Sequence, residues 1–195
     1  MTVPQAIGLA GKKECGKDEA GRILEERFGY RVVSPSEIIR AEINRYMELG
    51  QYPEAPTQIK EIMLYGKIAD LYRRPLSDNQ RVLQQWWGKW RRSQDEDYWV
   101  RRLKNKVDGR PWVNTSVRHK NEAEQVLEHG GIVILLTGRG GGVGGIEGHE
   151  SERIEFPADY IIDNSGTLEN LRQTLCYVVT AWGQRNEKLD KVSTA

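Results

Sequence analysis

Glycine and lysine residues near the N-terminus have a spacing that could bind phosphate. Gly11, Gly16 and Lys17 fit the pattern G-x-x-x-x-G-K, in which loop amides and a lysine ammonium surround phosphate oxygens. The next residue is Asp18, where such loops usually have a Ser or Thr whose hydroxyl reaches Mg²⁺. A carboxylate can also bind Mg²⁺, directly or through water, because this hard cation prefers oxygen ligands. The predicted phosphate-binding residues are Gly11, Lys12, Lys13, Glu14, Cys15, Gly16, Lys17 and Asp18.

The elements on either side decide between a phosphate site and an ordinary exposed glycine turn. Residues 4–10 are predicted to form a short strand, and residues 17–28 form a helix with Ala20, Ile23, Leu24 and Phe28 at helical spacing. A strand, a glycine turn and a helix in this order are the context that a phosphate loop requires. The flanking pattern therefore favours the phosphate site.

Two arginines follow predicted strands later in the chain. Arg118 comes after a strand at 112–117, and Arg139 comes after the apolar run at 132–136. In open α/β sheets the carboxyl ends of the strands face the ligand, which favours both arginines as site residues. Seven glycines in residues 138–148 predict a mobile lid over 138–150, in which Arg139 would add charge on closing. A plain surface loop is the alternative.

A third group of candidate residues lies on a predicted helix at 81–92. Arg81 and Gln84 share one helix face with Gly88, so this face could offer a phosphate contact, an amide for a base edge and room for close approach. Trp99 lies on the next predicted helix, at 96–107, and could stack on a base. Buried aromatic core is the more frequent role of such tryptophans.

The remaining pattern predicts an α/β fold. Strands alternate with helices, which indicates a parallel sheet in a single domain over residues 1–195. Residues 34–110 are expected to be largely helical and to bind the substrate, and residues 186–195 to form a flexible tail after a closing helix at 167–185. A helix at 120–129 is expected to be capped by Asn121.

Composition narrows the class of protein. The net charge of +1 gives no overall attraction to nucleic acid, although residues 81–120 hold eleven Lys and Arg against four Asp and Glu. A mean hydropathy of −0.66 and the lack of a long apolar run predict a soluble chain without a membrane span or a signal peptide. The two cysteines, Cys15 and Cys176, form no disulfide framework, so a cytoplasmic location is expected.

Five stretches, in this order, resemble the phage deoxynucleoside monophosphate kinases. They are GLAGKKECGKD, RVLQQWWGKWRRSQDEDYWVRRL, VNTSVRHKNEAEQVLEHGGIVILLTGRGG, GHESE and ADYIIDNSGTLENL. The family commonly has G-K-D at the end of its phosphate loop, as this chain has at Asp18. The resemblance covers most of the chain, although residues 30–75 match poorly. It implies a three-layer P-loop NTPase fold with a parallel sheet, a helical insertion that binds the monophosphate, and a glycine-rich lid.

The resemblance also implies an activity and roles for residues. It implies phosphoryl transfer from ATP to a deoxynucleoside monophosphate with Mg²⁺, by a homodimer in the host cytoplasm that supplies precursors for phage DNA synthesis. The implied catalytic residues are Lys17, Arg118 and Arg139, and the implied metal ligands are Asp18 and Glu150. The implied acceptor-binding residues are Arg81, Gln84, Gly88, Lys89, Trp99, Arg118 and Asn121.

The chain departs from the family at three places and leaves two other functions open. Ser116 stands where the family usually has an Asp, and Lys89 stands where it usually has a Thr. The run Ser34-Pro35-Ser36 stands where the family has a segment of the Asp-Pro-Leu-Lys type. One alternative is a P-loop kinase of another small acceptor, such as a dephospho-CoA-like molecule. The other is a protein without catalytic activity that binds nucleotides or single-stranded nucleic acid through residues 81–120. The near-neutral net charge argues against a nucleic-acid partner.

Overall fold

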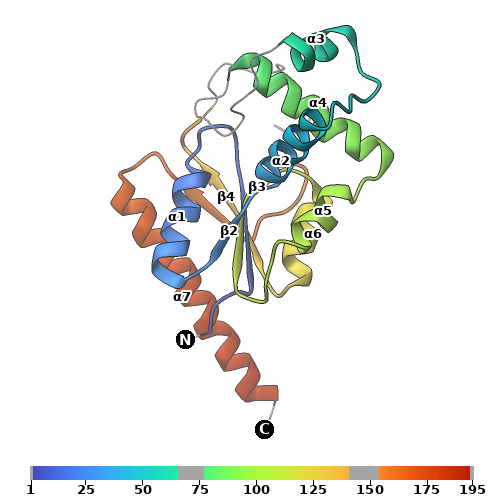
Figure 1. The fold of residues 1–195 in the computed structure, drawn as a ribbon. Helices are drawn as coiled ribbons and strands as arrows, with labels where there is room; N and C mark the ends of the chain where they lie inside the picture. The colour runs from blue at the N-terminus through green and yellow to red at the C-terminus, as the bar shows by residue number, and fades with distance from the viewer. Residues whose placement is uncertain (1, 66–76, 141–153, 194–195) are drawn as a thin grey trace. The chain divides into compact units, whose positions relative to one another are not determined.

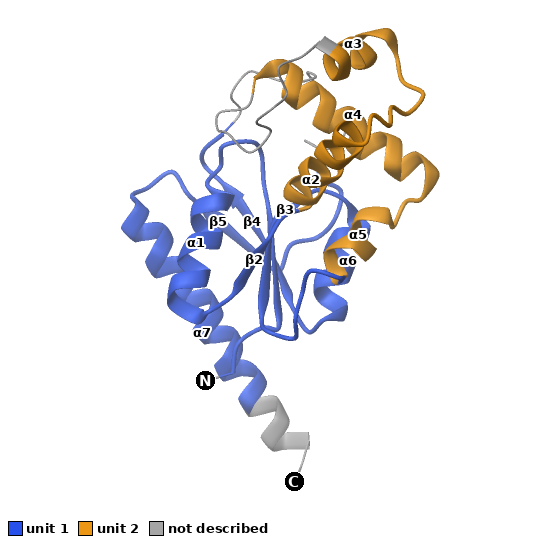
Figure 2. Ribbon diagram, in the orientation of Figure 1, with its two compact units in different colours: residues 1–34, 105–142, 149–195 blue, residues 35–104, 143–148 orange. Residues whose placement is uncertain are grey.

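The fold is seen in a computed structural model that describes residues 2–65, 77–140 and 154–193 (Figure 1). The chain divides into two compact units, of which the first holds residues 1–34, 105–142 and 149–195 and the second holds residues 35–104 and 143–148 (Figure 2). None of the helices in the described residues has both the length and the apolar composition needed to cross a membrane.

Unit 1 contains a five-stranded parallel sheet in the order β2-β3-β1-β4-β5. Helices α1 and α7 pack on one face of the sheet and α6 packs on the other, which makes the three layers of the predicted α/β fold (Figure 1). The elements of unit 1 are β1 (Ala6–Ala10), α1 (Lys17–Phe28), β2 (Arg31–Val33), β3 (Trp112–Val117), α6 (Lys120–Glu128), β4 (Ile132–Thr137), β5 (Tyr160–Asp163) and α7 (Leu168–Ser193).

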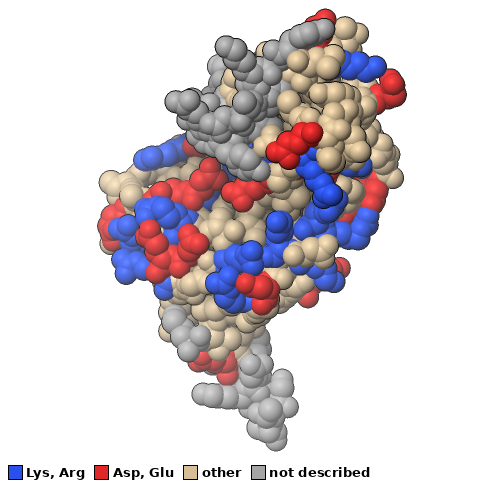
Figure 3. Space-filling view, in the orientation of Figure 1, with Lys and Arg blue, Asp and Glu red and all other residues tan. Residues whose placement is uncertain are grey.

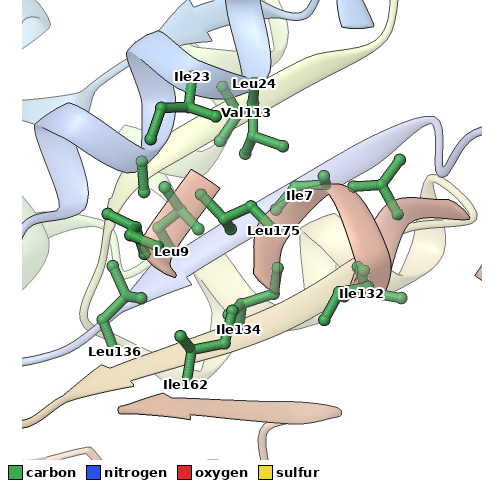
Figure 4. Close-up of a cluster of buried hydrophobic side chains, with 14 of the residues drawn as sticks. Ile7, Leu9, Ile23, Leu24, Val113, Ile132, Ile134, Leu136, Ile162 and Leu175 are labelled. Atoms are coloured by element: carbon green, nitrogen blue, oxygen red, sulfur yellow. The ribbon is translucent and has the colours of Figure 1, made fainter. Parts of the chain in front are cut away.

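The main core of unit 1 lies between the sheet and the α1/α7 layer (Figure 4). Ile7 and Leu9 of the central strand β1 are fully buried there, against Ile23 of α1 and Leu175 of α7. Gly8 faces the other layer, where a side chain would press on Val126 of α6. A central strand covered on both faces needs apolar or small residues at every position, as β1 has.

Helix α7 is longer than the sequence pattern indicated. It continues to Ser193, whereas the predicted helix ended near residue 185 and was followed by a tail at 186–195. Residues 186–192 contain no Gly or Pro and include several good helix formers, so the backbone has no local reason to leave the helix.

The described residues of unit 2, 35–65 and 77–104, form helices and the turns between them. The apolar core of this unit contains Trp87 and Trp99, and the carboxylate of Glu42 is buried beside it. Glu42 accepts hydrogen bonds from Trp87 Nε1 at 3.0 Å, Arg91 Nε at 2.6 Å and the Tyr98 hydroxyl at 2.5 Å. These partners offset the cost of burying its charge. The helices are α2 (Pro35–Glu48), α3 (Thr57–Tyr65), α4 (Asp78–Gln94) and α5 (Tyr98–Lys104).

Tyr30, at the start of β2, predicts a pH dependence of stability. Its hydroxyl donates to the Pro4 carbonyl at 2.7 Å, and burial raises the pKa of this phenol. In the unfolded chain this tyrosine therefore begins to ionise at about pH 10, whereas in the folded chain it stays protonated at that pH. Its contribution to the free energy of unfolding is complete below about pH 10 and is lost as the pH rises further. We expect Tyr30→Phe to lower the free energy of unfolding by about 1 kcal/mol at neutral pH. Above about pH 10 the stability of this variant should fall less steeply than that of the wild-type protein. Urea unfolding of both proteins across this range measures the difference, and parallel curves would contradict the prediction.

Candidate active site

The loop between β1 and α1 has the backbone of a tight anion-binding turn. Gly11 and Gly16 have φ angles of 141° and 99°, which favour glycine, and Glu14 between them also has a positive φ of 63°. A Cβ on Gly11 would lie 2.5 Å from the Leu136 carbonyl oxygen and 2.6 Å from Cys15 Sγ. The loop therefore packs too closely on β4 and on its own cysteine for any other residue at this position.

Lys17 places its ammonium over this loop. Its Nζ donates to the carbonyl oxygens of Gly11 at 2.7 Å and Lys12 at 2.6 Å, and lies 3.4 Å from Cys15 Sγ. Lys17 is also the first residue of α1, whose N-cap is Gly16 and has no side-chain hydrogen bond. The first backbone N–H groups of α1 can therefore donate hydrogen bonds to an anion that binds beside the ammonium.

The other loop residues surround this lysine. Lys12 is exposed, Lys13 pairs with Glu14 at 3.5 Å, and Asp18 is exposed in the first turn of α1. The buried Cys15 anchors the loop from inside, and its amide donates to the Lys12 carbonyl. Cys15 therefore packs into the base of the loop, while Lys12, Glu14 and Asp18 face solvent, where a ligand could reach them.

Strand register brings Arg118 and Arg139 to the edge of the sheet that holds the loop. Ala10 of β1 is paired with Val117 of β3 and with Leu135 of β4, so the loop begins beside the end of both neighbours. Arg118 directly follows β3, and Arg139 follows β4 after Gly138. The predicted convergence of the phosphate loop and two arginines at one edge is what the topology of unit 1 produces.

The backbone around Arg118 is held by a buried carboxylate. Glu122 accepts from the Arg118 amide at 2.7 Å and from the His119 amide at 3.3 Å, and Arg118 Nε lies 3.3 Å from Ser116 Oγ. The N-cap of α6 is therefore His119, and the expected cap at Asn121 is wrong, since Asn121 is already the second helical residue. The sequence patterns did not single out Glu122, the third residue of α6, as the residue that holds this backbone.

Arg139 and Gly140 lie at the start of the predicted lid. Arg139 is exposed, and its Nη2 donates to the carbonyl of Gly166. Gly140 approaches the phosphate loop so closely that a Cβ there would overlap the Lys13 carbonyl oxygen. The rest of the lid, including Glu150, lies outside the described residues.

Asn164 is a loop contact that the sequence patterns did not single out. It directly follows β5 and is buried, and its Nδ2 donates to the Cys15 carbonyl at 2.9 Å. Its position directly after the parallel strand β5 places the residue at the same sheet edge as Arg118 and Arg139. Nothing in the sequence indicated Cys15 as its hydrogen-bond partner, because 149 residues separate the two.

The predicted acceptor residues of unit 2 lie on α4 and α5. Arg81 and Gln84 are partly exposed on α4, and Gln84 Nε2 is a buried donor for which the described residues offer no acceptor. Gly88 is buried and Lys89 is exposed. Trp99 is only 2% exposed, and its Nε1 donates to the Gly88 carbonyl at 3.1 Å. The indole therefore packs as core and fixes the backbone at Gly88, while its contact with a substrate stays a prediction.

Comparisons with known proteins identify the fold. No protein-family profile and no curated protein match the chain. Among solved structures, a gluconokinase from Sinorhizobium meliloti 1021 matches with a TM-score of 0.56 and 14% identity over 97% of this chain and 99% of its own. This chain has the fold of a P-loop kinase. Shikimate kinases from Acinetobacter baumannii and Aquifex aeolicus match at TM-scores of 0.43 and 0.40, with 17% and 10% identity, covering 92% and 88% of this chain and 94% of each of theirs.

A P-loop kinase fold implies a magnesium ion, so we tested whether the residues fit one. Within the described residues no group of three or more His, Cys, Asp and Glu side chains could hold a metal. Mg²⁺ in kinases needs only one or two protein oxygens, because phosphate oxygens and water supply the rest. Asp18 meets this need, since it is exposed in the turn that follows the loop. Ser116, 7% exposed at the end of β3, offers a neutral hydroxyl oxygen.

Proposed function

We propose that this chain transfers the γ-phosphoryl group of ATP to a nucleoside monophosphate. The observation that carries the proposal is the loop with Lys17 over it, located at the sheet edge where Arg118 and Arg139 follow their strands. Such an arrangement provides amide donors and three cationic side chains for a polyphosphate. The P-loop kinase fold supports transfer from ATP to a small acceptor, and the resemblance to phage kinases supports the monophosphate and its deoxyribose.

The transfer requires little covalent chemistry from the protein. An oxygen of the acceptor phosphate forms a bond to the γ-phosphorus while the bond from that phosphorus to the β,γ-bridging oxygen breaks, which leaves ADP and a diphosphate. Lys17, Arg118 and Arg139 would neutralise the charge on the transferring group and align it with the acceptor. Asp18 would hold Mg²⁺, with Glu150 as a second predicted ligand, and the bound ion would offset charge on the phosphate oxygens.

A phosphate acceptor and a hydroxyl acceptor make different chemical demands on the site. A hydroxyl must lose a proton during transfer and therefore needs a general base, whereas a phosphate monoester is already ionised at neutral pH. Strand β3 ends with Thr115, Ser116 and Val117, which cannot act as general bases at neutral pH. Glu122, the next carboxylate after Arg118, already accepts two backbone amides.

Part of the positive charge of the basic segment at 81–120 is paired with carboxylates. Five of its cations form ion pairs, which use up much of their charge locally. On the face seen in Figure 3, lysines and arginines are interspersed with aspartates and glutamates. The pairs are Arg91–Glu42, Arg102–Glu42, Arg101–Asp95, Arg110–Asp108 and Lys120–Glu124.

An ADP-release assay across acceptors tests the proposal. ATP and Mg²⁺ are supplied with each ribo- and deoxyribonucleoside monophosphate, and with gluconate, shikimate and dephospho-CoA as alternative acceptors. We expect turnover with at least one monophosphate and none with the hydroxyl acceptors. Turnover with gluconate alone would contradict the proposal and indicate a sugar-acid kinase. Salt-dependent oligonucleotide binding without any turnover would indicate the non-catalytic alternative. Sedimentation of the same sample tests the homodimer that the phage resemblance implies.

A further inference from the structure

Asn164 links the phosphate loop to the far end of the chain. Its side-chain Nδ2 donates to the Cys15 carbonyl at 2.9 Å, and its backbone amide donates to the Thr137 carbonyl at the end of β4, also at 2.9 Å. The residue is only 6% exposed. A buried amide that joins β4, β5 and the loop through two hydrogen bonds is held in a single orientation.

Gly16 and Asn164 are matched to each other. A Cβ on Gly16 would overlap Asn164 Nδ2, so the close approach of the amide requires glycine at this position. Gly16 also has a φ of 99°, where glycine alone is unstrained. A glycine can rotate its preceding peptide at little cost, so the loop needs another contact to fix that peptide.

The hydrogen bond from Asn164 fixes the direction of the Gly16 amide. The Cys15 carbonyl and the Gly16 N–H belong to one planar trans peptide, in which the two groups point in opposite directions. Because Asn164 binds the carbonyl from the packed side of the loop, the N–H points away from Asn164. In a phosphate loop the amides are the groups that contact phosphate oxygens.

We infer that Asn164 is a positioning residue that aims the Gly16 amide at the phosphates of the bound nucleotide. The inference rests on the proposed function, since it concerns how that site binds its triphosphate. Asn164 itself touches the loop and not the ligand, so its effect is on phosphate binding and is independent of the nucleobase.

Calorimetric binding of two ligands to the whole protein tests the inference. We expect Asn164→Leu to bind Mg·ATP and inorganic tripolyphosphate with about tenfold lower affinity for each, the size of one lost charge-assisted hydrogen bond. The KM for ATP should rise by a similar factor while kcat and the KM for the acceptor change little, because the amide contacts ground state and transition state alike. Val178→Ala is the control, since it opens a cavity in the core at α7 without touching the loop and should change stability alone.

A second variant guards against loss of folding in Asn164→Leu. Asn164→Asp keeps the shape of the side chain but lacks the donor when ionised and regains one when protonated. Burial beside the Cys15 carbonyl should raise the pKa of this new carboxyl above the ordinary Asp range. The tripolyphosphate affinity of Asn164→Asp relative to wild type should therefore rise between about pH 8 and about pH 5, whereas that of Asn164→Leu should stay flat. Thermal unfolding verifies that each variant is folded.

The possible outcomes separate the inference from the proposed function. Wild-type affinity for tripolyphosphate in the Leu variant, together with a flat pH ratio in the Asp variant, would overturn the inference. Loss of ATP binding with tripolyphosphate binding intact would also overturn it, because that pattern indicates a contact with the base. A wild-type protein that binds neither ligand would overturn the proposed function itself.

Discussion

Replacing Lys17 with alanine is expected to lower kcat/KM for phosphoryl transfer by about three orders of magnitude. The ammonium lies over the loop on the Gly11 and Lys12 carbonyls, within reach of any anion that the amides bind. Charge that develops on the transferring group would then lose its nearest cation. The fold should survive, because the lysine is partly exposed and packs no core.

Steady-state kinetics with the preferred acceptor measure this loss. Arg22→Ala is the matched control, because it removes a positive charge from the same helix at an exposed position that pairs with Glu19 and Glu26 and does not contact the loop. Equal thermal unfolding of the two variants would exclude a folding defect. Retention of more than about a tenth of wild-type activity by Lys17→Ala would contradict a phosphate role for this lysine.

Replacing Arg118 with alanine is expected to lower kcat by about a hundredfold or more. Arg118 is the residue after β3, next to the strand that leads into the loop, and Glu122 holds its backbone. Because its backbone is held in place, the guanidinium can form two parallel hydrogen bonds to a phosphate. These bonds strengthen as charge builds up in the transition state.

Arg118→Lys separates charge from geometry in this prediction. Lysine keeps the charge but lacks the planar fork, so we expect it to recover only part of the lost rate. Arg101→Ala serves as the control, since Arg101 is exposed on α5 and paired with Asp95. If Arg118→Ala had wild-type kcat, or if lysine restored the full rate, the proposed contact with the reacting phosphates would be wrong.

The secondary structure around the site could be predicted because its signals are local. The glycines at 11 and 16 indicated a turn between a strand and a helix, and in the structure they lie between β1 and α1. Strand β3 begins at Trp112 and ends at Val117, as its β-branched pattern indicated. Helix ends were harder to predict, as the cap at His119 and the extension of α7 show, because several residues can cap or continue a helix at similar cost.

The amino-acid sequence by itself determined three features: a glycine loop with the spacing of a phosphate-binding loop, an alternation of strands and helices, and two arginines at strand ends. Each of these depends on residues that are close together in sequence. Only the tertiary structure decided the strand order that makes β1 the neighbour of both β3 and β4. It alone paired Asn164 with Cys15 and Glu122 with the amide of Arg118. The physical reason is that a hydrogen bond in the core is selected by which groups become buried together, and no short stretch of sequence contains that information.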